Sequence, residues 1–159
     1  MGHPEAPVGD LACDAYGVLI AQPRVREIVR RSAPTAEIVP VYTNFGEQLD
    51  LWNVPPTEGA FDPERAERLP DPSAPRTLYR RFAFHGSRIP GEIFKVNEAA
   101  PQLFVSDTPA AAGGLVEHLR AGTVTGLSLL EVWNDEGRDV PEFDPVLFKY
   151  AAPLRVPRF

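Results

Sequence analysis

The sequence predicts an α+β fold with a mixed, mainly antiparallel sheet and two principal helices. Three observations lead to this prediction. Short apolar segments rich in β-branched residues recur along the chain, two segments carry apolar residues at helical spacing, and 18 of the 159 residues are proline. Because proline fixes φ and lacks a backbone donor, we expect short elements joined by ordered loops.

The composition is that of an ordinary globular domain. Hydrophobic residues make up 43% of the chain and charged residues 24%. A chain of this length buries about 70% of its unfolded surface when it folds, so it can form a real core. We expect a single domain over residues 1–159, with a core over about 15–135 and a loop-rich tail over 136–159.

The first predicted unit is a strand followed by a helix. Residues 17–21 form a short apolar run with β-branched side chains. The helix begins with Pro23 at its first position and ends at Pro34. Its apolar stripe consists of Val25, Ile28 and Val29.

Two strands are predicted next, over residues 37–42 and 48–54, with a turn at residues 44–46. Pro40 cannot donate a hydrogen bond to a ladder. The strand that contains it is therefore expected at the edge of the sheet or at a bulge.

The middle of the chain is predicted to be the main connection. Residues 55–76 contain six prolines, which are too many for sustained regular structure. One short helix is expected inside this segment, with Asp62 as its N-cap, Pro63 at its first position and an end at about Glu67.

The second half is predicted to contain several strands and one helix. Strands are expected over residues 78–84, 92–96, 102–105 and 125–133. In the first of these, strand periodicity places four side chains on one face: Leu78, Arg80, Phe82 and Phe84.

The helix of the second half is expected to begin with Thr108 as N-cap and Pro109 at its first position, and to end at Gly122. Gly113 and Gly114 would weaken it unless close packing requires their small size. The order strand, helix, strand then occurs twice, and the sequence allows two β-α-β-like halves.

The net charge and the absence of targeting signals narrow the function classes. The formal charge is −6, which argues against a nucleic-acid partner held by its phosphates and favours a basic protein surface. No apolar run approaches the roughly 20 residues that span a bilayer. Cys13 is the only cysteine, so an internal disulfide is excluded. We expect a cytoplasmic protein without a membrane partner.

No cofactor or metal motif is found. Cys13 and the three histidines lack the spacing of a zinc site. The glycine-rich residues 86–91 and 113–114 do not have the spacing that cradles a phosphate. The acidic residues of the tail lack the pattern of a calcium loop, so no bound cofactor is expected.

A hydrolase-like interpretation would combine His85 or His118 with Ser87, Ser106 or Asp107, because a nucleophile needs a base that is itself oriented by an acid. The sequence has these residue types but no nucleophile elbow motif. Residues 106–107 already have a structural role at a helix start. We therefore expect no enzyme, and a half-buried, satisfied imidazole at His118.

The most acidic stretch is residues 134–145, where five acids oppose Arg138, for a net charge of one minus five, or −4. Because loops carry recognition more often than cores do, this stretch is predicted to dock a basic partner, with a solubilising loop as the alternative. Arg88, in the loop of residues 86–91, is a second candidate contact. The acidic candidates are Asp135, Glu136, Asp139, Glu142 and Asp144.

The order of short motifs resembles a known family. Leu78-x-x-x-Phe82-x-Phe84 is followed by residues 87–96, by residues 103–107 and by Thr125-Gly126-Leu127, which leads into Glu131-Val132-Trp133. Residues 18–20, 39–41 and 51–54 precede them in the same order. This succession is similar to family eleven of the bacterial immunity proteins, and the resemblance covers most of residues 15–135.

The resemblance implies a protein that binds and neutralises a cognate toxin and that has no catalytic residues to carry over. The partner would be that toxin protein. Two alternatives stay open, a small hydrolase-like enzyme that uses His85 or His118, and a regulatory ligand-binding module with a closed apolar pocket. The sequence leaves the oligomeric state open.

Overall fold

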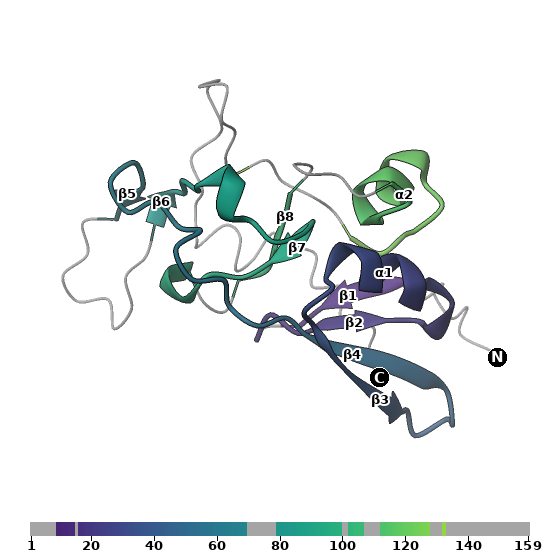
Figure 1. Cartoon of the computed structure of the whole chain (residues 1–159). Coiled ribbons are helices and arrows are strands. Elements are labelled where there is room, and N and C mark those ends of the chain that lie inside the picture. The colour runs from purple at the N-terminus through teal and green to yellow at the C-terminus, as the bar shows by residue number, and fades with distance from the viewer. Residues whose placement is uncertain are drawn as a thin grey trace.

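The computed structural model describes residues 9–14, 16–69, 79–99, 102–106, 112–127 and 132. Within them, two α-helices, α1 (Arg26–Ser32) and α2 (Leu115–Ala121), accompany antiparallel sheets (Figure 1). This confirms the predicted α+β class. No helix in the described part of the chain is long and apolar enough to cross a membrane.

The largest sheet has four antiparallel strands in the order β1-β2-β4-β3. The predictions of strands over residues 17–21, 37–42 and 48–54 and of a hairpin turn between the last two are confirmed. Pro40 lies on an edge strand, as its missing donor requires. The strand before residue 15 was not predicted. The strands are β1 (Leu11–Cys13), β2 (Leu19–Ala21), β3 (Glu37–Tyr42) and β4 (Gln48–Asn53).

The helix α1 lies across one face of this sheet, and α2 lies beyond it (Figure 1). A short 3-10 helix, η1 (Pro23–Val25), leads into α1. The register places Leu19 opposite Trp52, and both are fully buried with Val29 of the helix. The first core also contains Leu11, Ala21, Val25, Ala33, Val54, Ile93, Leu115 and Val124.

A second core is built mainly from aromatic side chains. Phe84 packs edge-on against Phe94 and Phe104, with ring centroids 5.3 and 5.0 Å apart. The elements around this core are β5 (Glu67–Arg68), β6 (Tyr79–Arg81), η2 (Gly86–Arg88), β7 (Ile93–Phe94), η3 (Asn97–Ala99) and β8 (Phe104–Val105).

The strand β7 joins the two cores. Side chains alternate along a strand, and Ile93 is buried in the first core whereas Phe94 is buried in the second. Figure 1 shows β7 and β8 between the four-stranded sheet and the β5–β6 pair. The two buried clusters of the described chain therefore meet at β7.

Two predictions for the middle of the chain are wrong in detail. The helix expected from Asp62 to Glu67 is a single turn, because the chain enters β5 at Glu67. The strand expected over residues 78–84 is described only as β6, over three residues. Residues 82–84 follow β6, and all three of them are buried.

The helix of the second half begins later than predicted. Thr108 and Pro109 lie outside the described residues, but α2 starts at Leu115 with Gly114 as its N-cap. Gly113 has a φ of +69°, which interrupts any helix that precedes it. The predicted end is confirmed, because Gly122 adopts the left-handed conformation at the C-cap.

Only one of the two β-α-β-like halves is found among the described residues. β2 and β3 both run antiparallel to β4, so they are parallel to each other on either side of it, with α1 between them in sequence. In the second half, residues 125–127 are not a strand, contrary to prediction. Residues 128–131 and 133–159 lie outside the described residues.

Candidate partner-binding surface

Asp135, Glu136, Asp139, Glu142 and Asp144 all lie outside the described residues. Their role in binding stays a prediction.

Arg88, the other predicted contact, lies at the end of η2 and is exposed. Its guanidinium donates a hydrogen bond to the carbonyl of Gly59 at 3.1 Å, and it borders Gly59 so closely that a Cβ there would meet Arg88 Nη1 at 3.2 Å. Arg88 therefore holds the loop of residues 57–60 against η2. This structural role leaves its part in partner binding a prediction.

His85, the first candidate base, lies beside a carboxylate that is engaged elsewhere. Its Nδ1 is 3.8 Å from Asp62 Oδ2, beyond hydrogen-bond distance. The same oxygen accepts a hydrogen bond from Arg65 Nε at 2.5 Å, and this bond is the main reason that the pKa of Asp62 is lowered. Asp62 also caps the turn that follows it, because its Oδ1 accepts from the backbone of Glu64 and Arg65.

His118, the second candidate base, belongs to the end of α2. Its Nδ1 lies 2.7 Å from Thr123 Oγ1, and its carbonyl accepts from the backbone of Thr123. The predicted half-buried, hydrogen-bonded imidazole is what the structure has. No group of three His, Cys, Asp or Glu side chains among the described residues can hold a metal ion.

Cys13 is the one thiol in the chain, and its surroundings keep it protonated. Burial raises the pKa of the Cys13 thiol to about 11, with a smaller contribution from the negative charge of Asp14. Since the thiolate is the nucleophilic form, this side chain is poorly suited to attack a substrate at neutral pH.

A fully buried acid, Glu92, joins three elements and was not singled out by the sequence. Its Oε2 accepts hydrogen bonds from the hydroxyl of Ser32 at the end of α1 and from the backbone of Leu115 at the start of α2, the second at 2.7 Å. Its Oε1 is buried without a hydrogen-bond partner. Gly114 lies directly against the carboxylate, so the network fixes α2 against α1.

Three of the four large apolar side chains that are exposed among the described residues lie on the β3–β4 hairpin. Phe45 is 89% exposed, Tyr42 71% and Val39 52%. Two further exposed residues of the hairpin are acids, Glu37 at the start of β3 and Glu47 in the turn after it. We refer to these five residues, Glu37, Val39, Tyr42, Phe45 and Glu47, as the hairpin surface.

The hairpin surface projects because β3 and β4 are longer than their neighbours. The last pair that includes β2 joins Ala21 to Asp50, whereas the β3–β4 ladder continues to the pair of Tyr42 and Gln48. Figure 1 shows the hairpin extending past β2. Beyond Asp50, the edge of β4 that faces β2 therefore has no neighbouring strand among the described residues.

The turn at the tip is well defined by hydrogen bonds. The backbone of Thr43 donates to the carbonyl of Glu47 at 2.8 Å, and Thr43 Oγ1 accepts from the backbone of Phe45 and Glu47 at 3.3 and 3.2 Å. Gly46 supplies the positive φ, +79°, that the turn requires. The aromatic side chains of the tip are thus presented on an ordered backbone.

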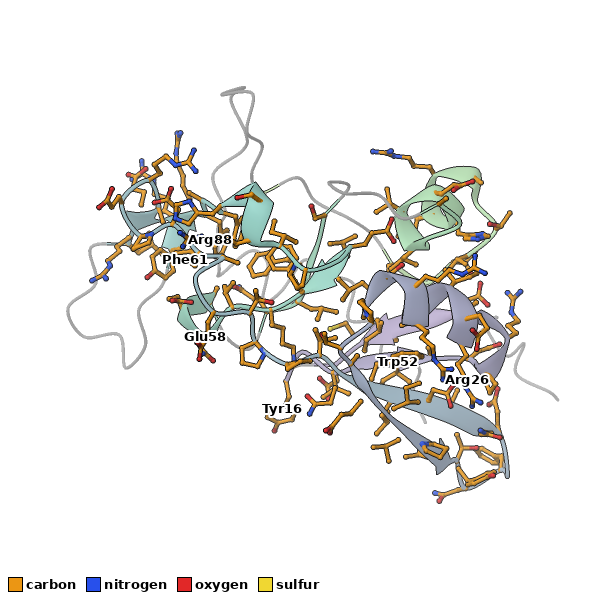
Figure 2. All side chains as sticks on the ribbon, in the orientation of Figure 1. Tyr16, Arg26, Trp52, Glu58, Phe61 and Arg88 are labelled. Atoms are coloured by element: carbon orange, nitrogen blue, oxygen red, sulfur yellow. The ribbon has the colours of Figure 1, made fainter. Side chains whose placement is uncertain are left out.

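The middle of β4 is fixed to the first residue of α1 by an ion pair. Arg26 Nε and Nη2 donate to the two carboxylate oxygens of Asp50 at 2.7 and 2.6 Å, a bidentate arrangement. Asp50 is fully buried, and Trp52, two residues further on, is buried on the same face. Figure 2 shows Arg26 and Trp52 near the hairpin base.

Tyr16 is the fourth exposed large apolar side chain, at 79%, but it is separate from the hairpin surface. It lies in the turn between β1 and β2, at the opposite end of the sheet (Figure 2). Arg88 and Phe61 lie still further away in the same view. Tyr16 is therefore a natural control for Tyr42.

Sequence analysis had placed residues 42–46 in a strand end and a turn without a function. The signal that was present is the position of Phe45 between Asn44 and Gly46. A turn needs no aromatic side chain, so a large exposed ring there indicates a role outside the fold.

Comparisons with known proteins place no further constraint on this surface. No protein-family model matches the chain, and neither the curated proteins nor the solved structures contain a match.

Proposed function

We propose that this chain is an immunity-type protein that binds and neutralises a cognate bacterial toxin by protein–protein contact. The observation that carries the proposal is the hairpin surface, where Tyr42 and Phe45 are exposed on an ordered, anchored hairpin. Aromatic side chains are enriched at the centres of interfaces, and a few of them supply most of the binding energy. A surface of about 800 Å² per partner is enough for a stable complex.

The succession of motifs that resembles the immunity proteins of family eleven supports the proposal, as does the formal charge of −6. The acidic candidates of residues 134–145 are proposed as a second contact that attracts the same basic partner. Neutralisation by contact needs a stable scaffold and a complementary surface. It needs no reaction at the side chains of this chain.

Co-expression tests the proposal. A toxin encoded next to this protein should arrest growth when expressed alone and should not do so when this chain is co-expressed. The purified proteins should form a stoichiometric complex, measured by isothermal titration calorimetry. Replacing both Tyr42 and Phe45 by Ala should weaken the complex by about 30- to 1,000-fold, because truncated anchors typically cost about 1–2 kcal/mol each. Tyr16→Ala, which truncates an equally exposed tyrosine, should leave the affinity unchanged.

Charge reversal at Asp135, Glu136 and Asp139 should weaken the same complex more at low salt than at high salt, because salt screens exposed charges. Unchanged association under both conditions would remove the tail from the interface. Rescue without a complex, lost on replacement of His85 or His118 by Ala, would contradict the proposal and favour the enzyme alternative.

A further inference from the structure

We infer that the outer edge of β3 is a docking site for an extended, basic segment of the partner protein, which pairs with β3 as an added strand. This inference rests on the proposed function and names the chemistry of the segment that the protein recognises. Three properties carry it: the edge position of β3, exposed apolar side chains on both of its faces, and two acids without an ion pair to a described residue, Glu37 at the start of β3 and Glu47 in the turn that follows it.

The edge position follows from the strand order. β3 is paired with β4 on one side, and among the described residues no strand pairs with its other side. At six residues it is as long as any strand described in this chain. An edge strand offers a row of backbone donors and acceptors to a further strand, and this is a common way to bind an extended peptide.

The devices that usually protect an edge are mostly missing from β3. Natural edge strands are kept from pairing by lysines, by shortness or by proline. β3 contains no Lys or Arg, and Pro40 removes one donor. Val39 and Tyr42 lie on opposite faces of the strand, since side chains alternate, and both are exposed. An added strand would therefore meet an apolar side chain on each face.

The charge around β3 selects the kind of segment. Between Arg31 and Arg65 the chain has no Lys, Arg or His, whereas acids occur throughout. Asp50 is buried and paired with Arg26, and Asp62 is paired with Arg65. Glu37 and Glu47, at the two ends of the hairpin surface, form no ion pair with any described residue. A strand with basic residues at its ends and apolar residues between them complements this pattern.

The same charges disfavour a second copy of this chain as the occupant. Antiparallel pairing of β3 with β3 of another copy would bring the acidic ends of the two hairpins together, and like charges on adjacent strands destabilise the pair. A basic partner gains attraction from the same acids.

The test uses the full-length protein and a defined probe. The probe is a capped heptapeptide with Lys at both ends and alternating Val and Thr between them, and its control has Glu in place of both Lys residues. In a two-dimensional NMR titration with the Lys peptide, the chemical-shift changes of the backbone amides should be concentrated in β3 and in the turn after it. The Glu peptide should bind at least about tenfold more weakly at low salt.

Two variants make the test specific. The double replacement of Glu37 and Glu47 by Lys should weaken binding of the Lys peptide about tenfold and strengthen binding of the Glu peptide, because the charge at both positions is reversed. Val39→Lys should weaken the binding of both peptides, because a charge replaces the exposed apolar side chain of the edge strand. Tyr16→Ala, in the turn between β1 and β2 and separated from β3 by β4, should leave both titrations unchanged.

The inference is overturned if the Lys peptide does not shift β3, or if the Glu37 and Glu47 variant binds both peptides as the original does. It is also overturned if sedimentation shows a dimer that Val39→Lys dissociates, since a second copy would then occupy the edge. If both variants bind the toxin as tightly as the original protein does, this inference is wrong but the proposed function is not affected. If the peptide binds β3 but the chain does not protect cells from the toxin, the inference about β3 holds and the proposed function is contradicted.

Discussion

At the scale of single residues, the described chain depends on buried carboxylates that each join distant segments. Asp10 accepts from the backbone and hydroxyl of Thr125 and pairs with Arg24, Asp50 pairs with Arg26, and Glu92 links both helices. Buried charges of this kind are tolerated only when their partners are in place.

Asp62 offers a test of this dependence through pH. The hydrogen bond from Arg65 lowers the pKa of Asp62 in the folded protein, so its carboxylate stabilises the fold above its unfolded pKa of about 3.9, and this stabilisation is lost as the pH falls through the lower folded pKa. Asp62→Asn keeps an oxygen that caps the turn but removes the charge. We expect it to lower the urea midpoint at pH 7, and we expect the difference from the original protein to shrink below about pH 4 and to vanish once the pH has fallen through the lowered folded pKa of Asp62.

The control for this measurement is Glu64→Gln, which removes an exposed carboxylate from the same turn. Its midpoint should follow that of the original protein at every pH. A constant difference between Asp62→Asn and the original protein from pH 7 to pH 2.5 would show that the charge of Asp62 is not the source of the effect.

Sequence analysis could not identify these buried acids. Asp, Glu and Arg are usually exposed, and only the folded chain shows that Thr125 meets Asp10 or that Leu115 meets Glu92. The exposed aromatic side chains of the hairpin could not be recognised from the sequence either, because Tyr42 fits the alternating pattern of a strand that packs on a core. The acidic candidates at residues 135–144 remain predictions on composition and charge alone.

At the scale of elements, the start of α2 depends on the space that Gly114 leaves for Glu92. A Cβ at Gly114 would lie 2.3 Å from Glu92 Oε2, and the carboxylate cannot swing away because it is buried and held by Ser32 and Leu115. The φ of Gly114 is −84°, which any residue can adopt, so only this clash opposes a substitution at Gly114. Gly114→Ala should therefore destabilise the protein by about 1–3 kcal/mol in urea unfolding.

A double-mutant cycle with Glu92→Ala separates the clash from other causes. With the carboxylate absent, Gly114→Ala should cost only a small fraction of its original effect, which gives a coupling energy of about 1 kcal/mol or more. Additive effects of the two substitutions would contradict this account of the helix start.

The elements that the sequence predicted well are those fixed by neighbouring residues. β3 and β4 follow from the β-branched run and from the turn at residues 44–46, and the start of the first helix follows from Pro23. The start of α2 was missed because the requirement for glycine comes from Glu92, more than twenty residues away. The two-residue strands β5, β7 and β8 exist only through their partners, which no local pattern reveals.

At the scale of the whole molecule, the two cores share β7, and this predicts that they unfold together. Phe104 packs against Phe82, Phe84 and Phe94 with ring centroids 5.2, 5.0 and 5.5 Å apart, all in the second core. Phe104→Ala should cost about 3–5 kcal/mol. If Ile93 and Phe94 transmit this loss, the first core should lose the same stability although none of its side chains is changed.

Trp52 reports on the first core, because it is fully buried there. In a Trp133→Phe background, its fluorescence and the far-ultraviolet circular dichroism should give the same urea midpoint, and Phe104→Ala should shift both equally. Phe45→Ala, on the exposed hairpin tip, should shift neither. If the Trp52 transition keeps its original midpoint while the circular dichroism acquires an earlier phase, the cores are independent. The hairpin surface would then depend on the four-stranded sheet and its helices alone, and a loss of the aromatic core would leave that surface folded.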